Sequence, residues 1–283
     1  MRRGAARSTA QVLKTERGLK FADKLARGWS VSAGHLCIGL DPLLERMPRA
    51  FARELRPALA FGRHVVDLVG DLACAFKPQF AHYAALGAET DLAELISYIH
   101  QTQPHAVVIL DAKRGDIGST AERYAQEAFV RHDADAVTVN PFMGDESVLP
   151  FLEKPDRGAV ILCRTTNPDA GRYQHAMAAS EPVFQAIARR AETVWNIRGN
   201  AMLVVGAADL KDMALARAAA PTLPFLVPGI GEQGGSAAEA MAAGARLCGG
   251  AGLVVSASRS ILYAGSDAGI RAAAEAAHRD LAA

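Results

Sequence analysis

The sequence predicts a single (β/α)₈ barrel. Eight short apolar runs, each about as long as a β-strand, recur along the 283 residues, with helix-like segments between several of them. Most of the runs are continuous rather than alternating, which is typical of parallel strands that are buried on both faces. Eight strand–helix units within about 250 residues have the usual size of a closed barrel.

The predicted elements follow from local patterns along the chain. Strands are predicted over residues 35–41, 73–77, 106–113, 136–140, 159–164, 201–206, 225–227 and 252–256. Helices are predicted over residues 91–100, 119–131, 181–197, 236–243 and 268–282. The first of these helices has apolar residues at helical spacing, and the last is rich in alanine, which has the highest helix propensity. Ser119, with Glu122 three residues later, has the pattern of a capping box at the start of the second helix.

The chain is predicted to form one domain. An open, doubly wound sheet is the competing architecture, but no G-x-G-x-x-G sequence follows the first strand, which weakens its dinucleotide-binding version. Residues 1–20 are predicted to be a frayed leader and residues 21–283 the barrel. The first residues are basic and lack the apolar core of a secretion signal. Residues 166–180 form the longest irregular stretch after a strand and could act as a lid at the catalytic face.

Composition argues against several classes of protein. Lys and Arg total 31 against 30 Asp and Glu, so the formal net charge is +1, and 50% of the residues are hydrophobic. That hydrophobic fraction is too high for a disordered chain. The near-neutral balance gives no long-range attraction to nucleic acid or to an anionic membrane, so neither partner is expected. No apolar stretch reaches about 18 residues, so a membrane span is not expected either.

The cysteines indicate a reducing compartment. Cys37, Cys74, Cys163 and Cys248 stand within or beside apolar runs, and none belongs to a C-x-x-C pair. They are therefore predicted to be buried free thiols rather than parts of a disulfide scaffold or a zinc site. A cytoplasmic location fits this pattern.

Charged residues stand where three consecutive predicted strands end. Asp111 and Lys113 lie two residues apart at the end of the third strand, so they point to the same face, and Asp116 follows in the turn. Lys77 ends the second strand, and Asp41 ends the first. Neighbouring strands lie about 4.8 Å apart, and buried charges are costly unless they are paired. Lys77 is therefore predicted to join Asp111, Lys113 and Asp116 in an alternating Lys–Asp–Lys–Asp array in the barrel mouth.

The ordered set of motifs at the strand ends resembles the orotidine 5′-phosphate decarboxylase family. The motifs are Asp41-Pro42, Phe76-Lys77-Pro78, Asp111-x-Lys113-Arg114-x-Asp116-Ile117-Gly118-x-Thr120, Pro228-Gly229-Ile230 and Ser258-Arg259. Asn140-Pro141-Phe142 and Thr165-Thr166-Asn167-Pro168 resemble the longer bacterial branch of that family. A lone D-x-K-x-x-D is only moderately specific, whereas the ordered set across eight strands is a strong signal.

The resemblance implies the decarboxylation of orotidine 5′-monophosphate to uridine 5′-monophosphate and CO₂, the last step of de novo pyrimidine synthesis, with no cofactor and no metal. The chemical difficulty is a carbanion at C6, in the plane of the ring, where the π system stabilises it poorly. The site must therefore stabilise it electrostatically. By resemblance, Lys113 faces the developing charge and then gives a proton to C6. Asp111 and Asp116 would keep that lysine charged, and Lys77 would hold Asp111 and contact the ribose.

The same resemblance implies which residues bind the substrate. Asp41 would hydrogen-bond the ribose hydroxyls. Arg259, after the eighth strand, would pair with the phosphate, where barrels commonly hold such groups. Gln233 would contact the same phosphate. Thr165 or Thr166 would read the edge of the pyrimidine.

The resemblance also implies a homodimer. In the family, the Asp and Thr of the D-I-x-x-T stretch enter the partner subunit's site, so Asp116, Ile117 and Thr120 would be contributed across the interface. The sequence departs from the family's pattern at Ser258, where many members have glycine before the arginine.

Three other functions fit parts of the pattern. A magnesium-dependent sugar-phosphate decarboxylase or aldolase shares D-x-K-x-x-D but needs metal-binding acids, whereas the second strand ends here in Lys77. A Schiff-base aldolase would use a lysine with a lowered pKa, which two flanking aspartates oppose. A non-catalytic nucleotide-binding barrel would bind uridylate without turnover, which is hard to reconcile with an intact Lys–Asp–Lys–Asp set.

Overall fold

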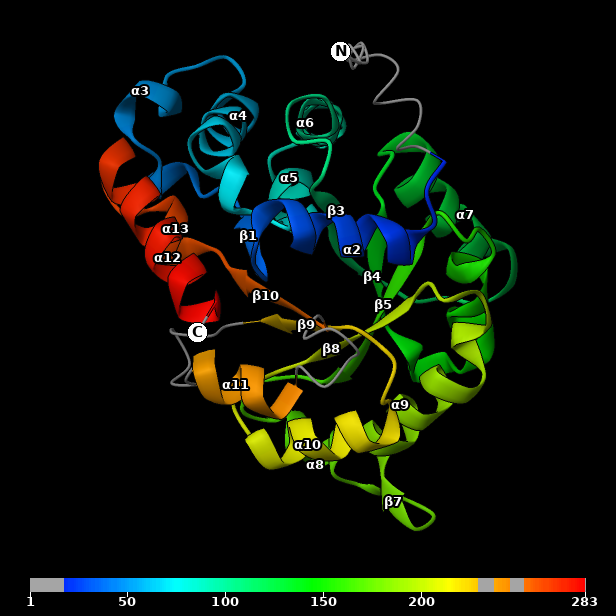
Figure 1. The fold of residues 1–283 in the computed structure, drawn as a ribbon. Helices are drawn as coiled ribbons and strands as arrows, with labels where there is room; N and C mark the ends of the chain where they lie inside the picture. The colour runs from blue at the N-terminus through cyan, green and yellow to red at the C-terminus, as the bar shows by residue number, and fades with distance from the viewer. Residues whose placement is uncertain (1–17, 229–236, 245–251, 283) are drawn as a thin grey trace, which may run out of the picture.

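The computed structural model describes residues 18–228, 237–244 and 252–282, and within them eight parallel strands close into a barrel (Figure 1). The strands are β1 (Leu36–Leu40), β2 (Ala75–Pro78), β3 (Val107–Arg114), β4 (Ala136–Val139), β5 (Gly158–Arg164), β8 (Ala201–Val205), β9 (Phe225–Pro228) and β10 (Leu253–Ala257). They follow one another around the ring in chain order, and β10 pairs with β1 to close it. The predicted barrel is therefore confirmed, and the open sheet is excluded.

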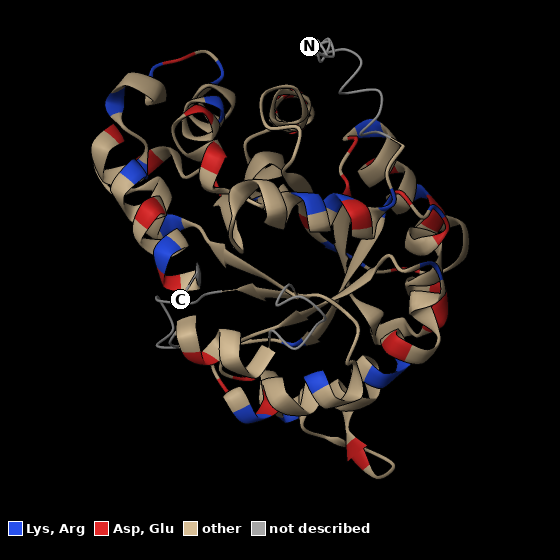
Figure 2. Cartoon of the chain, in the orientation of Figure 1, with Lys and Arg blue, Asp and Glu red and all other residues tan. Residues whose placement is uncertain are grey.

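Helices surround the barrel (Figure 1). The longer ones are α4 (Pro57–Val69), α6 (Glu89–Thr102), α7 (Gly118–Gln126), α9 (Val183–Thr193), α10 (Leu210–Ala219), α11 (Ala237–Gly244) and α13 (Asp267–Ala282). The short ones are α3 (Arg49–Ala52), α5 (Phe80–Ala85), α8 (Ala170–Gln174) and α12 (Arg259–Leu262). Charged residues of both signs lie mainly on these helices and on the loops (Figure 2). None of the described helices is long and apolar enough to cross a bilayer.

Two predicted helices differ in detail from those observed. The segment 119–131 is α7 followed by a π-helical turn over Glu127–Arg131. Ser119 is not its cap, because α7 begins at Gly118 and the N-cap position is Ile117, which forms no side-chain cap. The segment 181–197 begins with β7 (Glu181–Pro182), which pairs antiparallel with β6 (Met177–Ala178). This small hairpin lies within the long loop after β5, so the loop has regular structure of its own.

Two apolar layers lie on the two sides of the barrel wall. Side chains that point away from the axis, such as Ile38, Phe76 and Leu203, pack against the surrounding helices. Side chains that point inward, such as Val107 and Met202, form a separate cluster inside the barrel. Because successive side chains of a strand point to opposite faces, continuous apolar runs fill both layers at once.

Helix α2 (Phe21–Ser32) closes the amino-terminal end of the barrel. Its side chains Phe21 and Leu25 belong to the cluster inside the barrel. Gly28 allows the close approach, because a Cβ there would lie 2.6 Å from the carbonyl oxygen of Cys74. The barrel is therefore plugged at this end. Residues 1–17 of the predicted leader lie outside the described residues.

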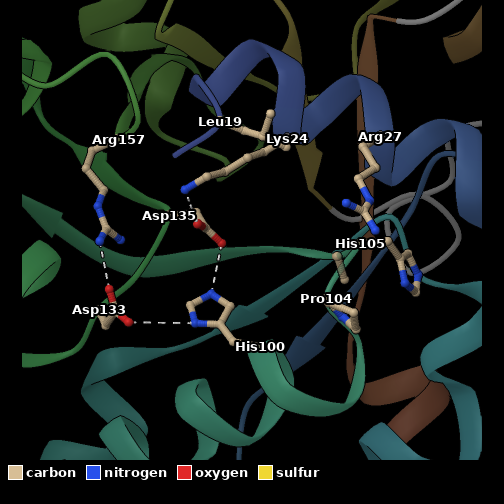
Figure 3. A pocket seen from close by; sticks show the side chains of 10 residues that line it. Leu19, Lys24, Arg27, His100, Pro104, His105, Asp133, Asp135 and Arg157 are labelled. Atoms are coloured by element: carbon tan, nitrogen blue, oxygen red, sulfur yellow. Dashed lines mark hydrogen bonds and ion pairs between the residues drawn. The ribbon is translucent and has the colours of Figure 1, made fainter. Parts of the chain in front are cut away.

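A cluster of paired charges surrounds a small cavity at the same end (Figure 3). Lys24 of α2 donates to buried Asp135 at 2.8 Å, and His100 of α6 lies 3.1 Å from the same carboxylate. Arg157 donates to the neighbouring Asp133 at 2.7 Å. Burial would raise the pKa of Asp135, but His100 and Lys24 hold it well below its ordinary value. The cavity measures only about 50 Å³, so this network ties α2 and α6 to the start of β4 and does not hold an organic ligand.

Candidate active site

A much larger cavity, of about 960 Å³, opens at the carboxyl end of the barrel. Active sites of this fold lie at that end, and the volume is that of a small-molecule site. Side chains from the strand ends and from the long loop after β5 line it: Asp41, Lys77, Asp111, Lys113, Thr138, Thr165, Thr166, Gln174, Ser256, Ser258 and Arg259.

Strand alternation brings the central side chains into this cavity. Ala75 and Val107 point inward near the start of β2 and β3. Lys77, two residues after Ala75, and Asp111, four residues after Val107, therefore point inward as well. Both are buried, with 7% and 6% of their surface exposed.

Asp111 is the centre of the site. Its Oδ2 accepts hydrogen bonds from Lys77 Nζ and Gln79 Nε2, both at 3.0 Å. Its Oδ1 accepts from Lys113 Nζ at 2.6 Å and from Thr138 Oγ1 at 2.9 Å. A carboxylate has about four acceptor positions, so this one is saturated. Asp111 is therefore suited to hold other groups in place rather than to take up a proton.

Charge pairing decides which protonation states this centre adopts. Burial would raise the pKa of the Asp111 carboxyl, but the ammonium groups of Lys77 and Lys113 hold it well below its ordinary range. Burial would likewise lower the pKa of Lys77, but Asp111 and then Asp41 raise it above its ordinary value. Asp111 therefore stays a carboxylate and Lys77 an ammonium near neutral pH.

Lys113 lies on a bulge in β3. The pairing of β3 with β4 shifts between Leu110 and Arg114, so the strand does not alternate regularly there. Lys113 itself has a φ of 46°, a conformation that costs a residue with a Cβ about 1 kcal/mol or more. The predicted proximity of Asp111 and Lys113 is correct, but a bulge produces it rather than simple two-residue alternation. The lysine side chain is 49% exposed, toward the cavity that it lines.

The outer end of this bulge is anchored by Arg114. Its guanidinium donates to both carboxylate oxygens of Glu127, at 2.9 and 3.0 Å. The same group lies over the rings of Phe80 and Tyr124, 4.4 and 4.7 Å from their centroids. Bidentate pairing and stacking are contacts that arginine makes and lysine does not. Arg114 thus fixes the chain directly after Lys113.

Asp41 presents an unused acceptor to the site. Its Oδ2 accepts from Ser258 Oγ at 2.6 Å, and its backbone oxygen accepts from Tyr263 Oη at 2.9 Å. Its Oδ1 is buried and has no hydrogen-bond partner among the residues that the structure describes. A buried, unpaired carboxylate oxygen in a cavity wall is suited to accept a hydrogen bond from a ligand hydroxyl.

The two threonines after β5 also line the cavity. Gln174 of α8 holds Thr165 at two points: it accepts from the backbone nitrogen at 2.9 Å and donates to Oγ1 at 2.8 Å. Thr166 packs against Gly206, where an added Cβ would lie 2.1 Å from its methyl group. A contact of that length is impossible, so glycine at position 206 makes room for Thr166.

The remaining predicted residues fall into three groups. Arg259 lines the cavity, whereas Gln233 lies outside the described residues. Asp116, Ile117 and Thr120 do not line the cavity of their own chain: Asp116 accepts from the Ile117 backbone nitrogen at 2.8 Å, and Ile117 is 48% exposed. A single chain therefore brings Lys77, Asp111 and Lys113 together but leaves Asp116 apart from them.

Three side chains of the site were missed by the sequence interpretation. Thr138 and Gln79 bind Asp111, and Gln174 holds Thr165. Thr138 carries a readable signal, since it is a polar residue two positions after inward-facing Ala136. Gln79 and Gln174 lie in connecting segments, where no periodicity marks them. The thiols of Cys37, Cys74 and Cys163 are buried and free, as predicted, and Cys248 lies outside the described residues.

Comparison with known proteins gives consistent results. A model of the family described as orotidine 5′-phosphate decarboxylase / HUMPS matches residues 34–276. The protein named orotidine 5′-phosphate decarboxylase of Janthinobacterium sp. (strain Marseille) is 45% identical over 249 residues, which cover 88% of this chain and 92% of the relative. The protein of the same name from Ralstonia pickettii (strain 12J) is 46% identical over the same shares of both chains. The solved structure of Leishmania donovani OMP decarboxylase superposes with a TM-score of 0.81 at 36% identity, covering 93% of this chain and 97% of that one.

Proposed function

The chain belongs to the orotidine 5′-phosphate decarboxylase / HUMPS family, and from that premise we propose that it converts orotidine 5′-monophosphate to uridine 5′-monophosphate and CO₂. This is the last step of de novo pyrimidine synthesis. One observation carries the proposal: a saturated carboxylate, Asp111, lies between the ammonium groups of Lys77 and Lys113 in the mouth of the barrel.

The proposed mechanism assigns the proton transfer to Lys113. The bond between C6 and the carboxylate carbon breaks, CO₂ leaves, and the electron pair stays on C6. The Lys113 ammonium, held 2.6 Å from Asp111, stabilises that charge without reorganising and then donates a proton to C6. Solvent returns a proton to the neutral amine. Asp111 cannot compete for the proton because its acceptor positions are filled.

The substrate is proposed to bind along the cavity wall. Asp41 would accept from the ribose hydroxyls through its unpartnered Oδ1, and Lys77 would contact the same sugar. Arg259, with Gln233, would bind the phosphate. Thr165 or Thr166 would contact the pyrimidine edge, from positions fixed by Gln174 and Gly206.

An assay of orotidylate loss tests the proposal directly. We expect purified protein to consume orotidine 5′-monophosphate, followed by its ultraviolet absorbance, at the same rate with and without EDTA. The physical reason is that Lys77 and Lys113 already neutralise Asp111, which leaves no excess negative charge there for a divalent cation. Strict metal dependence, or turnover of a sugar phosphate in place of orotidylate, would instead favour the magnesium enzymes. Trapping of the protein by borohydride would favour a Schiff-base aldolase.

We further propose that the enzyme is a cytoplasmic homodimer, with Asp116, Ile117 and Thr120 completing the partner's site. Apolar side chains near these residues support a second copy as the partner: Ile117 is 48% exposed, Phe142 88% and Met143 48%. The buried free thiols fit a reducing compartment.

Hybrid dimers test the shared site. Lys113→Ala and Asp116→Ala subunits, each inactive alone, are mixed in equal amounts and allowed to exchange. Random pairing in a two-fold dimer makes half of the dimers hybrid, each with one intact site, so about a quarter of wild-type activity should return. Native mass spectrometry verifies the exchange. Absence of activity in a verified hybrid would mean that Asp116 does not act across an interface.

A further inference from the structure

The hydroxyl of Thr138 makes three hydrogen bonds at the centre of the site. Oγ1 accepts from the backbone nitrogens of Ala112 and Lys113, at 3.0 and 2.8 Å, and donates to Asp111 Oδ1 at 2.9 Å. A hydroxyl has one donor and two acceptor positions, so all of them are used. The residue is 1% exposed, which leaves it no solvent as an alternative partner.

These contacts replace the missing part of the ladder between β3 and β4. Leu110 pairs with Val137 and Arg114 pairs with Val139, so three residues of β3 lie opposite Thr138 alone. Backbone N–H groups in such a bulge lose their regular strand partners. The Thr138 hydroxyl binds two of them, including that of Lys113, whose φ is 46°. A strained conformation of this kind persists only where the surroundings impose it.

We propose that Thr138 is a positioning residue for the reaction, whose hydroxyl holds the β3 bulge in the backbone geometry from which Lys113 reaches both Asp111 and the cavity. The kinetic part of this inference rests on the proposed decarboxylation, whereas its structural part does not. Thr138 acts through Lys113 and Asp111, and the proposal requires no contact between Thr138 and the substrate.

Two substitutions separate the hydroxyl from the shape of the side chain. Thr138→Val keeps the branched shape but removes the hydroxyl, so two buried N–H groups lose their acceptor and Asp111 loses one donor. Thr138→Ser keeps the hydroxyl and loses only the methyl group. Thr102→Val is the matched control, because the Thr102 hydroxyl is exposed and donates to a carbonyl within its own helix at 2.9 Å.

Steady-state kinetics give the first readout. We expect Thr138→Val to lower kcat roughly 100-fold, since misplacing a catalytic group by about 1 Å costs that much, with KM changed less than about threefold. Thr138→Ser and Thr102→Val should stay within about threefold of wild type in both constants. A Thr138→Val enzyme that keeps a third or more of wild-type kcat overturns the proposal. So does a Thr138→Ser enzyme as impaired as Thr138→Val.

Titration of the Asp111 carboxyl in the folded protein gives a readout that is specific to the Thr138–Asp111 bond. Removing a donor from a carboxylate raises its pKa. The depressed pKa of Asp111 should therefore rise in Thr138→Val and stay in place in Thr138→Ser, as followed by NMR of its carboxyl carbon. An Asp111 carboxyl that titrates identically in all three proteins contradicts the role assigned to the Thr138–Asp111 bond.

Amide hydrogen exchange tests the positioning without any substrate. In the wild-type protein the amides of Ala112 and Lys113 should exchange slowly, and in Thr138→Val at least tenfold faster, while β4 amides change little. If wild-type protein fails to decarboxylate orotidylate, the proposed function is wrong, and exchange at these two amides alone decides the role of Thr138. Unchanged protection in Thr138→Val overturns the proposal. If that variant does not fold, fast exchange at both amides in Thr138→Ser overturns it.

Discussion

Replacing Lys113 by alanine should lower the turnover of orotidylate about 10⁴-fold or more while leaving the fold and product binding intact. The change removes both a positioned proton donor, worth about 10²–10⁴-fold, and a preorganised charge, worth about 10²–10³-fold. Asp111 keeps three of its donors, from Lys77, Gln79 and Thr138, so no buried carboxylate is left unpaired. The measurements are kcat by absorbance, affinity for uridine 5′-monophosphate by calorimetry, and the midpoint of thermal unfolding.

The matched control is Lys211→Ala, the same change at an exposed lysine of α10. It should alter none of the three quantities. If Lys113→Ala decarboxylates within about tenfold of wild type, Lys113 is not the proton donor. If it loses activity only because it unfolds, the unfolding midpoint will reveal that, and the statement that Asp111 remains satisfied is wrong.

The barrel strands were predictable because each is short, continuous and apolar. A strand buried on both faces does not alternate, because both the interior cluster and the outer layer take apolar side chains from it. Some helices were missed although their pattern could be read. Helix α4 buries one face along Ala58, Phe61, Val65 and Val69, which is the spacing of an amphipathic helix, so its sequence carried a signal that the interpretation did not use.

The charged centre was predictable because buried charges are rare and need partners. Lys77, Asp111 and Lys113 stand at the ends of apolar strands, and the structure joins them as expected. The backbone conformation that brings Lys113 to Asp111 was not predictable from the sequence of β3 alone. The register shift that gives Lys113 its positive φ depends on Thr138 of the neighbouring strand, and pairing register is a tertiary property. The role of Asp116 depends on a second chain and stays a prediction.

Replacing Asp111 by asparagine should both lower activity strongly and destabilise the protein. Lys77 would remain buried, with 9% of its side chain exposed, and would lose its charged partner. Removing one member of a buried pair typically costs about 3–5 kcal/mol. The measurements are the free energy of unfolding in urea at pH 7 and kcat, which we expect to fall about 10³-fold because Lys113 is no longer held. Asp23→Asn, at an exposed aspartate of α2, is the control and should cost less than about 0.5 kcal/mol.

The pH dependence of that destabilisation has a definite sign. The folded-state pKa of Asp111 is depressed, so its contribution to stability is fully present above the unfolded-state value, about 3.9. It is lost as the pH falls through the folded-state pKa. The difference in the free energy of unfolding between wild type and Asp111→Asn should therefore be constant from pH 7 to about pH 5 and shrink below about pH 4. A difference that widens toward acid pH would contradict the charged state assigned to Asp111.

A double substitution separates the stabilising role of this pair from its catalytic role. In Asp111→Asn combined with Lys77→Met, the orphaned ammonium is gone and an apolar chain of similar length fills its place. Exchanging a buried ion pair for well-packed groups is often neutral in stability, so most of the lost free energy of unfolding should return. Activity should not return, because the carboxylate that holds Lys113 is still missing. Recovery of both stability and activity would mean that Asp111 serves the fold alone. Recovery of neither would mean that Lys77 is not the charge whose burial Asp111 compensates.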